Sequence, residues 1–152
     1  MVDKNKVEII EYTDKYKKDV IDFLIQITAQ EFCHPEWSKH IEYELLEQYK
    51  KGNNNFWIAL DTDKRIIGTC GAFQKSDKVI KLNSFYVDST YRGTGIGKGL
   101  YNLLEEFARQ KGYETIVLGT YEQFDMGIKF YEKRGFKISK TIGKELWYKK
   151  DI

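Results

Sequence analysis

The sequence has few of the residues that mark secreted, metal-binding or membrane-spanning proteins. Only two cysteines, Cys33 and Cys70, and two histidines occur in 152 residues, with no Cys-x-x-Cys pair. This sparse set favours a reducing, cytoplasmic environment and predicts no metal site. The chain starts Met-Val-Asp-Lys-Asn-Lys, without the apolar run of a signal peptide, and no stretch approaches membrane-spanning length. We therefore expect a cytoplasmic protein with no membrane partner.

An excess of one charge is also missing. The 25 basic and 23 acidic residues leave a net charge of +2, whereas nucleic-acid-binding domains carry a clear basic excess. We expect no nucleic-acid partner. The chain is 41% hydrophobic and 15% aromatic, which is typical of a folded chain, and its length suits one domain over residues 1–152 with its own core.

Apolar spacing predicts alternating strands and helices. Strands are expected at 7–12, 56–60, 65–75, 79–87, 115–120, 136–141 and 145–149, and helices after Thr13 or Asp14, at about 39–50, at 96–111 and at 125–134. The three strands between 56 and 87 are joined by short turns and should form an antiparallel meander. The order β-α-α-β-β-β-α-β-α-β-β describes an α/β fold with a mixed, mostly antiparallel sheet flanked by helices.

A glycine-rich loop stands at the centre of this pattern. The strand at 79–87 leads into Arg92-Gly-Thr-Gly-Ile-Gly97, and an amphipathic helix follows. Glycines let a ligand approach the main chain closely, and the first turn of a helix presents unpaired N–H groups and partial positive charge. A strand, a glycine loop and a helix start together predict a binding site for a phosphate or pyrophosphate.

The loop does not fit the two commonest phosphate motifs. A Walker A loop needs four residues between its first glycine and Gly-Lys, followed by Ser or Thr. Three residues separate Gly93 from Gly97-Lys98, and Gly99 follows the lysine. The dinucleotide pattern Gly-x-Gly-x-x-Gly fails as well, because Lys98 and Leu100 stand at the two positions where its third glycine would fall.

Two segments together resemble the GNAT superfamily of N-acetyltransferases. Arg92 to Gly97 is similar to that family's acyl-CoA-binding pattern, Gln or Arg, two residues, Gly, one residue, then Gly or Ala. About forty residues later, Phe130-Tyr-Glu-Lys-Arg-Gly-Phe136 resembles a second family signature. The resemblance implies a GNAT fold across the chain, acetyl-CoA as cosubstrate, no metal, and transfer of an acetyl group to a primary amine.

The resemblance also implies a cofactor site. In the family, a gap between the strands at 79–87 and 115–120 admits the pantetheine arm, and the loop holds the pyrophosphate through main-chain N–H groups. The residues that this places on acetyl-CoA are Phe85, Tyr86, Val87, Arg92, Gly93, Thr94, Gly95, Ile96, Gly97 and Lys98. One departure concerns Phe124, which stands where many members have a cofactor-contacting asparagine.

Three catalytic candidates follow from the same resemblance. Tyr131 stands where the family commonly carries the general acid that protonates the departing CoA thiolate. Strand alternation in one register places Lys81, Asn83, Phe85 and Val87 on the face that meets the acceptor, with no carboxylate among them. Glu31, together with His34 and Glu36 in the break around Pro35, is the candidate for a proton relay.

Several alternatives stay open at this level. The acceptor is either a small-molecule amine or a peptide amine, and the family's habit implies a homodimer. A non-catalytic acyl-CoA-binding sensor is the rival from another class, and a nucleotide-phosphate module is a weaker one.

Overall fold

The computed structural model of the chain describes residues 6–31 and 43–152. Their main elements are β1 (Glu8–Glu11), α1 (Lys17–Gln30), α2 (Tyr43–Tyr49), β2 (Asn55–Leu60), β3 (Ile66–Gln74), β4 (Val79–Val87), α3 (Ile96–Gln110), β5 (Thr115–Tyr121), α4 (Asp125–Lys133), β6 (Lys137–Ile142) and β7 (Glu145–Asp151). The predicted order is confirmed, and each boundary inside the described residues lies within two residues of its prediction, except at the start of α1. The predicted first residues of α2 lie outside the described residues.

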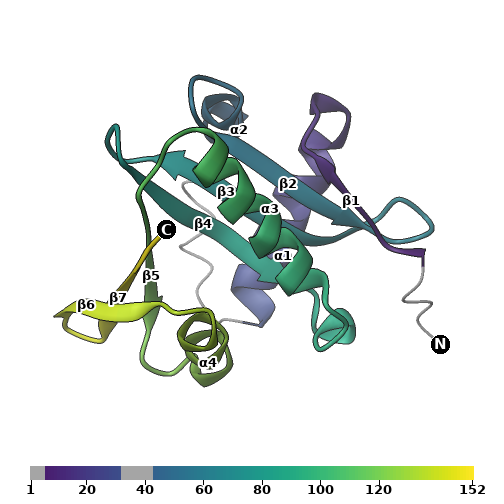
Figure 1. Ribbon diagram of the computed structural model, residues 1–152. Helices are drawn as coiled ribbons and strands as arrows, with labels where there is room; N and C mark the ends of the chain where they lie inside the picture. Colours follow the sequence, from purple (N-terminus) through teal and green to yellow (C-terminus); the bar gives the residue numbers. More distant parts are fainter. Residues whose placement is uncertain (1–5, 32–42) are drawn as a thin grey trace.

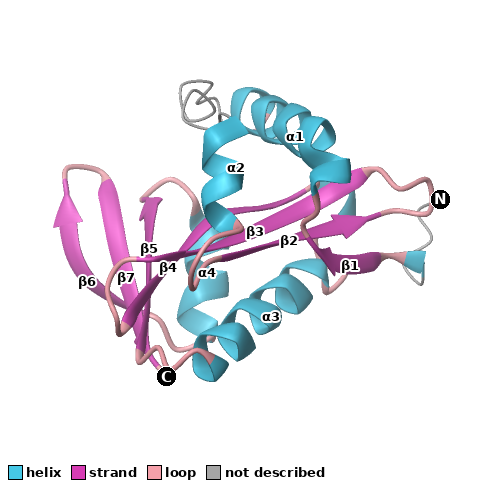
Figure 2. Ribbon diagram, turned by 90° about the horizontal axis from the view of Figure 1, so that it is seen from above, coloured by secondary structure: helices cyan, strands magenta, loops and turns pink. Residues whose placement is uncertain are grey.

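The strands form one sheet in the order β1-β2-β3-β4-β5-β7-β6. Only β4 and β5 are parallel neighbours, and all other described pairs are antiparallel. The expected mixed, mostly antiparallel sheet is therefore confirmed, as is the β2-β3-β4 meander, and β6 and β7 close the chain as a hairpin. Figure 2 shows α1 and α2 on one face of the sheet and α3 and α4 on the other. We call these the α2 face and the α3 face.

Each face has its own hydrophobic core. Under α3, the fully buried Leu100, Leu104 and Ala108 pack with side chains of β2 to β5, as the apolar stripe of this helix predicts. Tyr101 lies outside that predicted stripe, yet it is 2% exposed because Phe130 and Phe136 pack against its ring. The second core lies under α1 and α2. The sheet thus separates two cores, one on each of its faces, and β4 lies between them.

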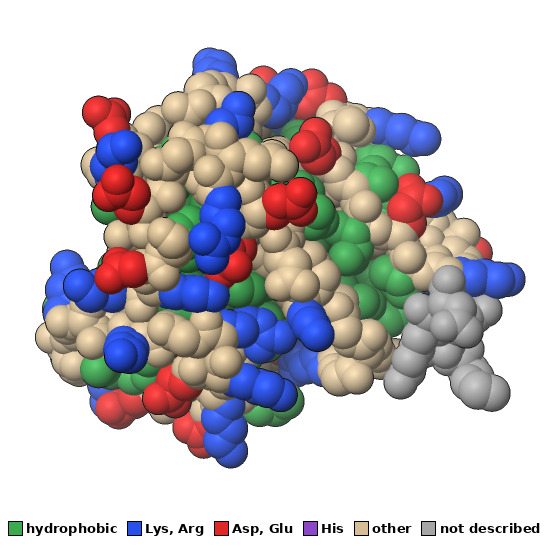
Figure 3. Space-filling view, in the orientation of Figure 1, with side chains coloured by type: hydrophobic (Ala, Val, Ile, Leu, Met, Phe, Trp, Pro, Cys, Tyr) green, Lys and Arg blue, Asp and Glu red, His purple; other side chains and the backbone are tan. Residues whose placement is uncertain are grey.

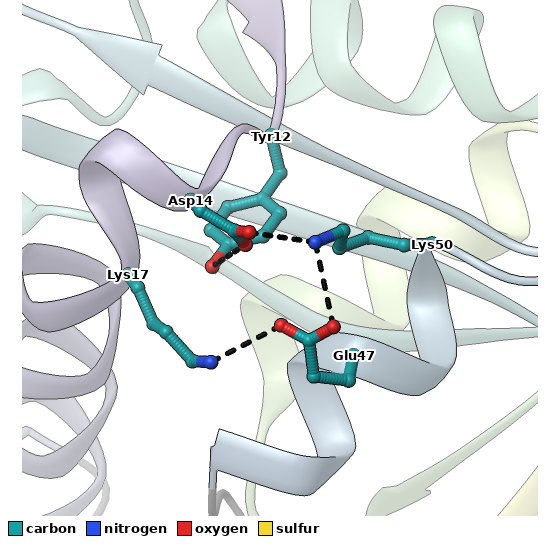
Figure 4. A network of polar contacts seen from close by, with 5 residues as sticks. All are labelled: Tyr12, Asp14, Lys17, Glu47 and Lys50. Carbon is teal, nitrogen blue, oxygen red and sulfur yellow. Dashed lines mark hydrogen bonds and ion pairs between the residues drawn. The ribbon is translucent and has the colours of Figure 1, made fainter.

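The start of α1 differs from its prediction. A 3-10 turn over Asp14–Tyr16 precedes the helix, and the Thr13 side chain makes no capping hydrogen bond. The Asp14 carboxylate instead accepts from Lys50 at 2.7 Å, and Lys50 also reaches Glu47 (Figure 4). Lys17 binds the other oxygen of Glu47 at 3.1 Å. This network joins the C-terminal half of α2 to the beginning of α1. The Asp14 carboxylate therefore links the two helices and does not cap α1.

The sheet opens between β4 and β5. Their pairing covers only Val79–Lys81 of β4 with Thr115–Val117 of β5. Beyond that point β4 runs on to Val87 beside β3, and β5 runs on to Tyr121 beside β7. The two strands therefore separate toward their C-terminal ends, and main-chain groups there face a gap instead of a partner strand (Figure 1).

A β-bulge at Ser84 changes the faces of β4. Ser84 has a φ of +48°, and the register with β3 shifts so that one extra residue lies in β4. Asn83 consequently meets Tyr49 on the α2 face, whereas Phe85 and Val87 pack with the α3 core. The prediction that Asn83, Phe85 and Val87 share a face is wrong, because strict alternation does not continue through a bulge.

Gly71 allows α2 to pack closely on β3. A Cβ at this position would lie 2.9 Å from Cε1 of Tyr49, whose ring is 2% exposed and cannot move aside. We expect Gly71→Ala to lower the free energy of unfolding by about 1–3 kcal/mol, as overpacked cores do. Urea denaturation measures this. Gly127→Ala is the control, because its Cβ would have 3.8 Å to its nearest neighbour and alanine favours the helix. Equal stabilities of the two variants would contradict the packing.

Candidate functional site

The loop before α3 presents a set of main-chain donors. Gly93 and Gly95 have φ values of +76° and +90°, and Gly95 is the residue that precedes the helix. The first N–H here to make a well-formed bond to a backbone carbonyl is that of Gly99, which donates to Gly95 at 2.9 Å. Within the described residues, the N–H groups of residues 93–98 make none. They therefore remain available to an anion, reinforced by the positive end of the α3 dipole.

The loop is shaped before any ligand arrives. Asp88 accepts from the N–H of Thr90 at 2.9 Å, and the Thr94 hydroxyl donates to the carbonyl of Tyr91. Arg92 Nε donates to the carbonyl of Val87 at 3.2 Å. A Cβ added at Gly93 or Gly95 would meet nothing within 4 Å. The two glycines thus border open space, as a site that receives a diphosphate requires.

Glu31, which follows α1, forms an ion pair with Arg92, which lies in the loop before α3. The guanidinium of Arg92 donates to the Glu31 carboxylate, which stands just past the end of α1. Two residues predicted for different roles, one on the cofactor and one in a proton relay, are therefore in contact. The other relay candidates, His34 and Glu36, lie outside the described residues.

The α3-face wall of the gap consists of aromatic and aliphatic side chains. Phe85 and Val87 of β4 lie 3.7 Å from the position that a Cβ on Gly97 would take, so the end of β4 packs on the start of α3. Tyr131 of α4 lies beside them, with its ring centroid 6.3 Å from that of Phe85. The structure thus brings Phe85, Val87 and Tyr131 together with the glycine loop.

Tyr131 is 9% exposed and packs among Phe85, Phe130 and Phe136. No hydrogen bond joins its hydroxyl to another described residue. Burial raises the pKa of the Tyr131 phenol well above its usual range, and the nearby Cys70 and Tyr86 act in the same direction. Its hydroxyl therefore stays protonated at any physiological pH and is free to donate to a ligand.

The α2 face of β4 holds a different set of groups. Asn83 Nδ2 donates to the Tyr49 hydroxyl at 3.0 Å, and burial raises the pKa of Tyr49 to about 12. Tyr86 lies on the same face, and burial likewise raises the pKa of its phenol to about 12. Asn83 is thus held by a neutral donor-acceptor partner, separate from the wall that carries Tyr131.

Phe124, just before α4, and Gly127, within it, stand where the family pattern commonly has asparagine and alanine. Phe124 immediately precedes the helix, and its ring lies 6.0 Å from that of Tyr121 in an edge-to-face contact. A Cβ added to Gly127 would lie 3.8 Å from Cε2 of Tyr131. An aromatic contact therefore takes the place where many members have an asparagine, and an alanine would fit at Gly127.

An indole that no sequence motif marks also lies near the opening between β4 and β5. Trp147 of β7 pairs with Gly119 of β5, and its ring covers that glycine on the α2 face. Lys81 of β4 reaches the same ring, with Nζ 5.2 Å from its centroid. A glycine inside a strand is a signal of close approach by another group, and Gly119 could have been interpreted in that way.

A metal site and a membrane span each need a recognisable arrangement of residues. Among the described residues, no cluster of His, Cys, Asp and Glu could hold a metal ion. No helix in the part of the chain that the structure describes is long and apolar enough to cross a bilayer. Figure 3 shows acidic and basic side chains interspersed over the α3 face.

Comparison with known families and proteins gives a consistent result. The model of the Acetyltransferase (GNAT) family matches residues 21–136. N-acetylaspartate synthetase of Xenopus tropicalis is 36% identical over 107 residues, which are 68% of this chain and 39% of that protein. Human N-acetyltransferase 8B is 34% identical over 87 residues, 54% of this chain and 38% of that protein. The chain thus spans about two fifths of the length of these relatives.

Solved structures show the same fold. An acetyltransferase of the GNAT family from Staphylococcus aureus Mu50 superposes with a TM-score of 0.82 at 25% identity, covering 95% of this chain and 98% of that one. The PaiA N-acetyltransferase of Thermoplasma acidophilum, solved in complex with coenzyme A, has a TM-score of 0.82 at 20% identity, covering 97% and 99%.

Proposed function

The chain belongs to the GNAT acetyltransferase family, and from this premise we propose that it is an acetyl-CoA-dependent N-acetyltransferase that acetylates a primary amine by direct attack. The observation that carries the proposal is the row of N–H groups at residues 93–98, which open beside the gap between β4 and β5. A phosphate-binding loop and a splayed parallel strand pair suit a ligand with a diphosphate at one end and an extended amide arm.

The residues present fit coenzyme A. The N–H groups from Gly93 to Lys98 would hold the diphosphate, each bond to a charged oxygen contributing about 1.5–3 kcal/mol. Main-chain groups of Phe85, Tyr86 and Val87 would pair with the amides of the arm, as a neighbouring strand would. The side chain of Arg92 adds positive charge to the loop, and no metal is needed to neutralise the phosphates.

Acetyl-CoA supplies a thioester carbonyl, which a neutral amine attacks directly. The protein's part is to hold the thioester in the gap and to stabilise the charge that develops on the carbonyl oxygen. We assign that stabilisation to a main-chain N–H of β4 near Val87. No covalent acyl-enzyme is required, and Cys70 is unsuited to form one because burial raises the pKa of its thiol far above the usual range.

Tyr131 assists the leaving group in this proposal. Its hydroxyl is protonated and makes no hydrogen bond to a described residue, and its ring lies beside that of Phe85. With an ordinary phenol pKa near 10, protonation of a thiolate near 8.5 would already be uphill by about 2 kcal/mol. The raised pKa of Tyr131 increases this cost, so its main contribution is a hydrogen bond to sulfur as negative charge develops.

The amine must lose its proton before it attacks. An α-amine with a pKa near 8 loses only about 1 kcal/mol to protonation at pH 7, whereas a lysine-type amine loses roughly 4–5 kcal/mol. Glu31 remains the proposed relay carboxylate, held in place by Arg92, and Asn83 a proposed contact on the acceptor side. With this equipment an amine of low pKa is the easier acceptor.

The test is thiol release from acetyl-CoA against a panel of amines. The panel should contain polyamines, aminoglycosides, short peptides and free amino acids, with aspartate included because one relative is named N-acetylaspartate synthetase. Release above the rate of hydrolysis with at least one class supports the proposal. Silence across the panel, with coenzyme A bound tightly by calorimetry, would favour a non-catalytic sensor instead.

The pH dependence of kcat/KM should be one-sided. Because the attacking amine must be neutral, we expect kcat/KM to rise about tenfold per pH unit until the pKa of the acceptor is passed. Burial disfavours the Tyr131 phenolate and raises its pKa, so its proton stays in place and adds no falling limb up to about pH 10. A falling limb below pH 9 that disappears in Tyr131→Phe would contradict this environment.

A further inference from the structure

An unassigned cluster of donors lies on the α2 face, at the point where β4 leaves β5. Lys81 is the last residue of β4 that pairs with β5, opposite Val117. Gly119, two residues further along β5, is on the same face as Val117, and Trp147 pairs with it from β7. Lys81 of β4 and Trp147 of β7 therefore lie on the same face of the sheet, near the point where β4 and β5 separate.

The indole of Trp147 is held in a defined position. Its ring atoms Cε2 and Cζ2 lie 3.3 Å from the place of a Cβ on Gly119, so the bare strand accepts the flat ring. The adjoining Nε1 is buried and has no hydrogen-bond partner among the described residues. Leaving a buried donor unpaired is destabilising, so this Nε1 favours a ligand that brings an acceptor.

Two lysine ammonium groups lie near the Trp147 ring. The Nζ of Lys81 lies 5.2 Å, and that of Lys140 5.3 Å, from the centroid of the Trp147 ring. Neither lysine belongs to any ion pair in the described part of the chain. Lys81 is half-buried, and burial together with the charge of Lys75 lowers its pKa, while Glu145 raises it. A half-buried cation without a counter-ion is a second reason to expect an anionic ligand.

Resting on the proposed function, we propose that Lys81 and Trp147, assisted by Lys140, bind the carboxylate of a free amino acid whose amine is the acetyl acceptor. A carboxylate accepts several hydrogen bonds, so it can take one from an indole N–H and others from an ammonium group. The placement at the opening between β4 and β5 puts such an acceptor at the edge of the thioester's gap.

Glu145 makes the cluster suitable for a zwitterion. Its Oε1 lies 3.2 Å from the place of a Cβ on Gly119, beside the indole. It is close enough to influence the pKa of Lys81, yet it forms no ion pair with it. A negative group next to two positive ones and a neutral donor matches an amine and a carboxylate on neighbouring atoms. A polyamine or an aminoglycoside offers no carboxylate to pair with Lys81.

The experiment compares matched acceptors in matched variants. Rates with acetyl-CoA are measured for aspartate, alanine and glycine and for the corresponding amides, and each kcat/KM is expressed per neutral amine, because the amides have the lower amine pKa. Wild type should prefer the acids in kcat/KM. Lys81→Met should reduce that preference about tenfold to a hundredfold, as expected for a lost charge-assisted hydrogen bond, and Lys81→Arg should restore part of it. Trp147→Phe, which keeps a ring but removes the donor, should show a smaller loss in the same direction.

Lys78→Met is the control. It removes the same charge three residues before Lys81, from a side chain that is 63% exposed, and the preference for acids should not change. The KM for acetyl-CoA should be equal in all these variants. Equal kcat/KM for acids and amides in wild type, or an undiminished preference in Lys81→Met, would overturn the carboxylate site while leaving the acetyltransferase intact.

A binding measurement separates this proposal from the proposed function. Calorimetric titration of free amino acids into the protein saturated with coenzyme A reports the site without turnover. Binding that is present in wild type and Lys78→Met and lost in Lys81→Met supports the carboxylate site, even if no acetyl transfer were found. Absence of binding to wild type would count against it, whatever the enzyme does with other amines.

Discussion

Tyr131→Phe should lower kcat by about tenfold to a hundredfold, the loss expected for one hydrogen bond to the charge that develops on sulfur, and leave the affinity for coenzyme A within twofold of wild type. The substitution removes only the hydroxyl, and the ring contacts with Phe85, Phe130 and Phe136 are retained. Stability should therefore change little. Steady-state rates with the best acceptor, together with calorimetry of coenzyme A binding, measure the two quantities separately.

Tyr148→Phe is the matched control for that variant. Tyr148 is 5% exposed and belongs to the same hydrophobic core, but it lies on β7 and not on the wall of the gap. It should keep wild-type turnover. If both variants kept it, the Tyr131 hydroxyl would have no part in the chemistry, and the sulfur would have to leave with help from solvent. If both lost it, the effect would be one of packing.

Gly95→Val should weaken coenzyme A binding by about a hundredfold or more. Gly95 has a φ of +90°, a region that a β-branched residue enters only with strain, so the loop would rearrange. Misalignment of two N–H donors to a diphosphate, at about 1.5–3 kcal/mol each, accounts for a loss of this size. Calorimetric titration with coenzyme A gives the affinity, and turnover at saturating acetyl-CoA shows whether the chemistry is retained.

Gly143→Val separates strain from ligand binding. Gly143 has a φ of +61° in the β6–β7 hairpin, and a Cβ there would also meet nothing within 4 Å. Both valine variants should lose stability by a similar amount. Only Gly95→Val should lose coenzyme A. An unchanged affinity in Gly95→Val would mean that the diphosphate is held elsewhere, and the proposed function would fall with it.

Much of the fold could be predicted because its signals are local. The strand predicted at 79–87 has these bounds in the structure, and the next helix begins at Ile96 as predicted. β-branched residues, a glycine loop and an apolar stripe all agree in this region. Thr13 and Asp14 are the exception. A capping residue was expected at this point, but the Asp14 carboxylate is taken by Lys50, a partner 36 residues away that no local pattern reveals.

The candidate site was predictable where it consists of backbone and less so where it consists of side chains. The loop at 92–97 is recognisable from glycine spacing alone. The prediction of which side chains share a face of β4 was wrong, because the bulge lies at Ser84 and a serine gives no sign in the sequence of a positive φ. Trp147 was overlooked because its contact with Lys81 joins strands more than sixty residues apart, and only the sheet order brings them together.

The bulge at Ser84 has a consequence for insertions and deletions in β4. Removing Ser84 itself would restore simple alternation and leave Phe85, Tyr86 and Val87 on their present faces, whereas adding a residue elsewhere in this part of the strand would turn the residues after it to the opposite face. Replacement by glycine or asparagine, which accept a positive φ readily, would leave all three where they are. The strand thus tolerates a change of residue type at position 84, or the loss of that residue, better than an insertion at another point.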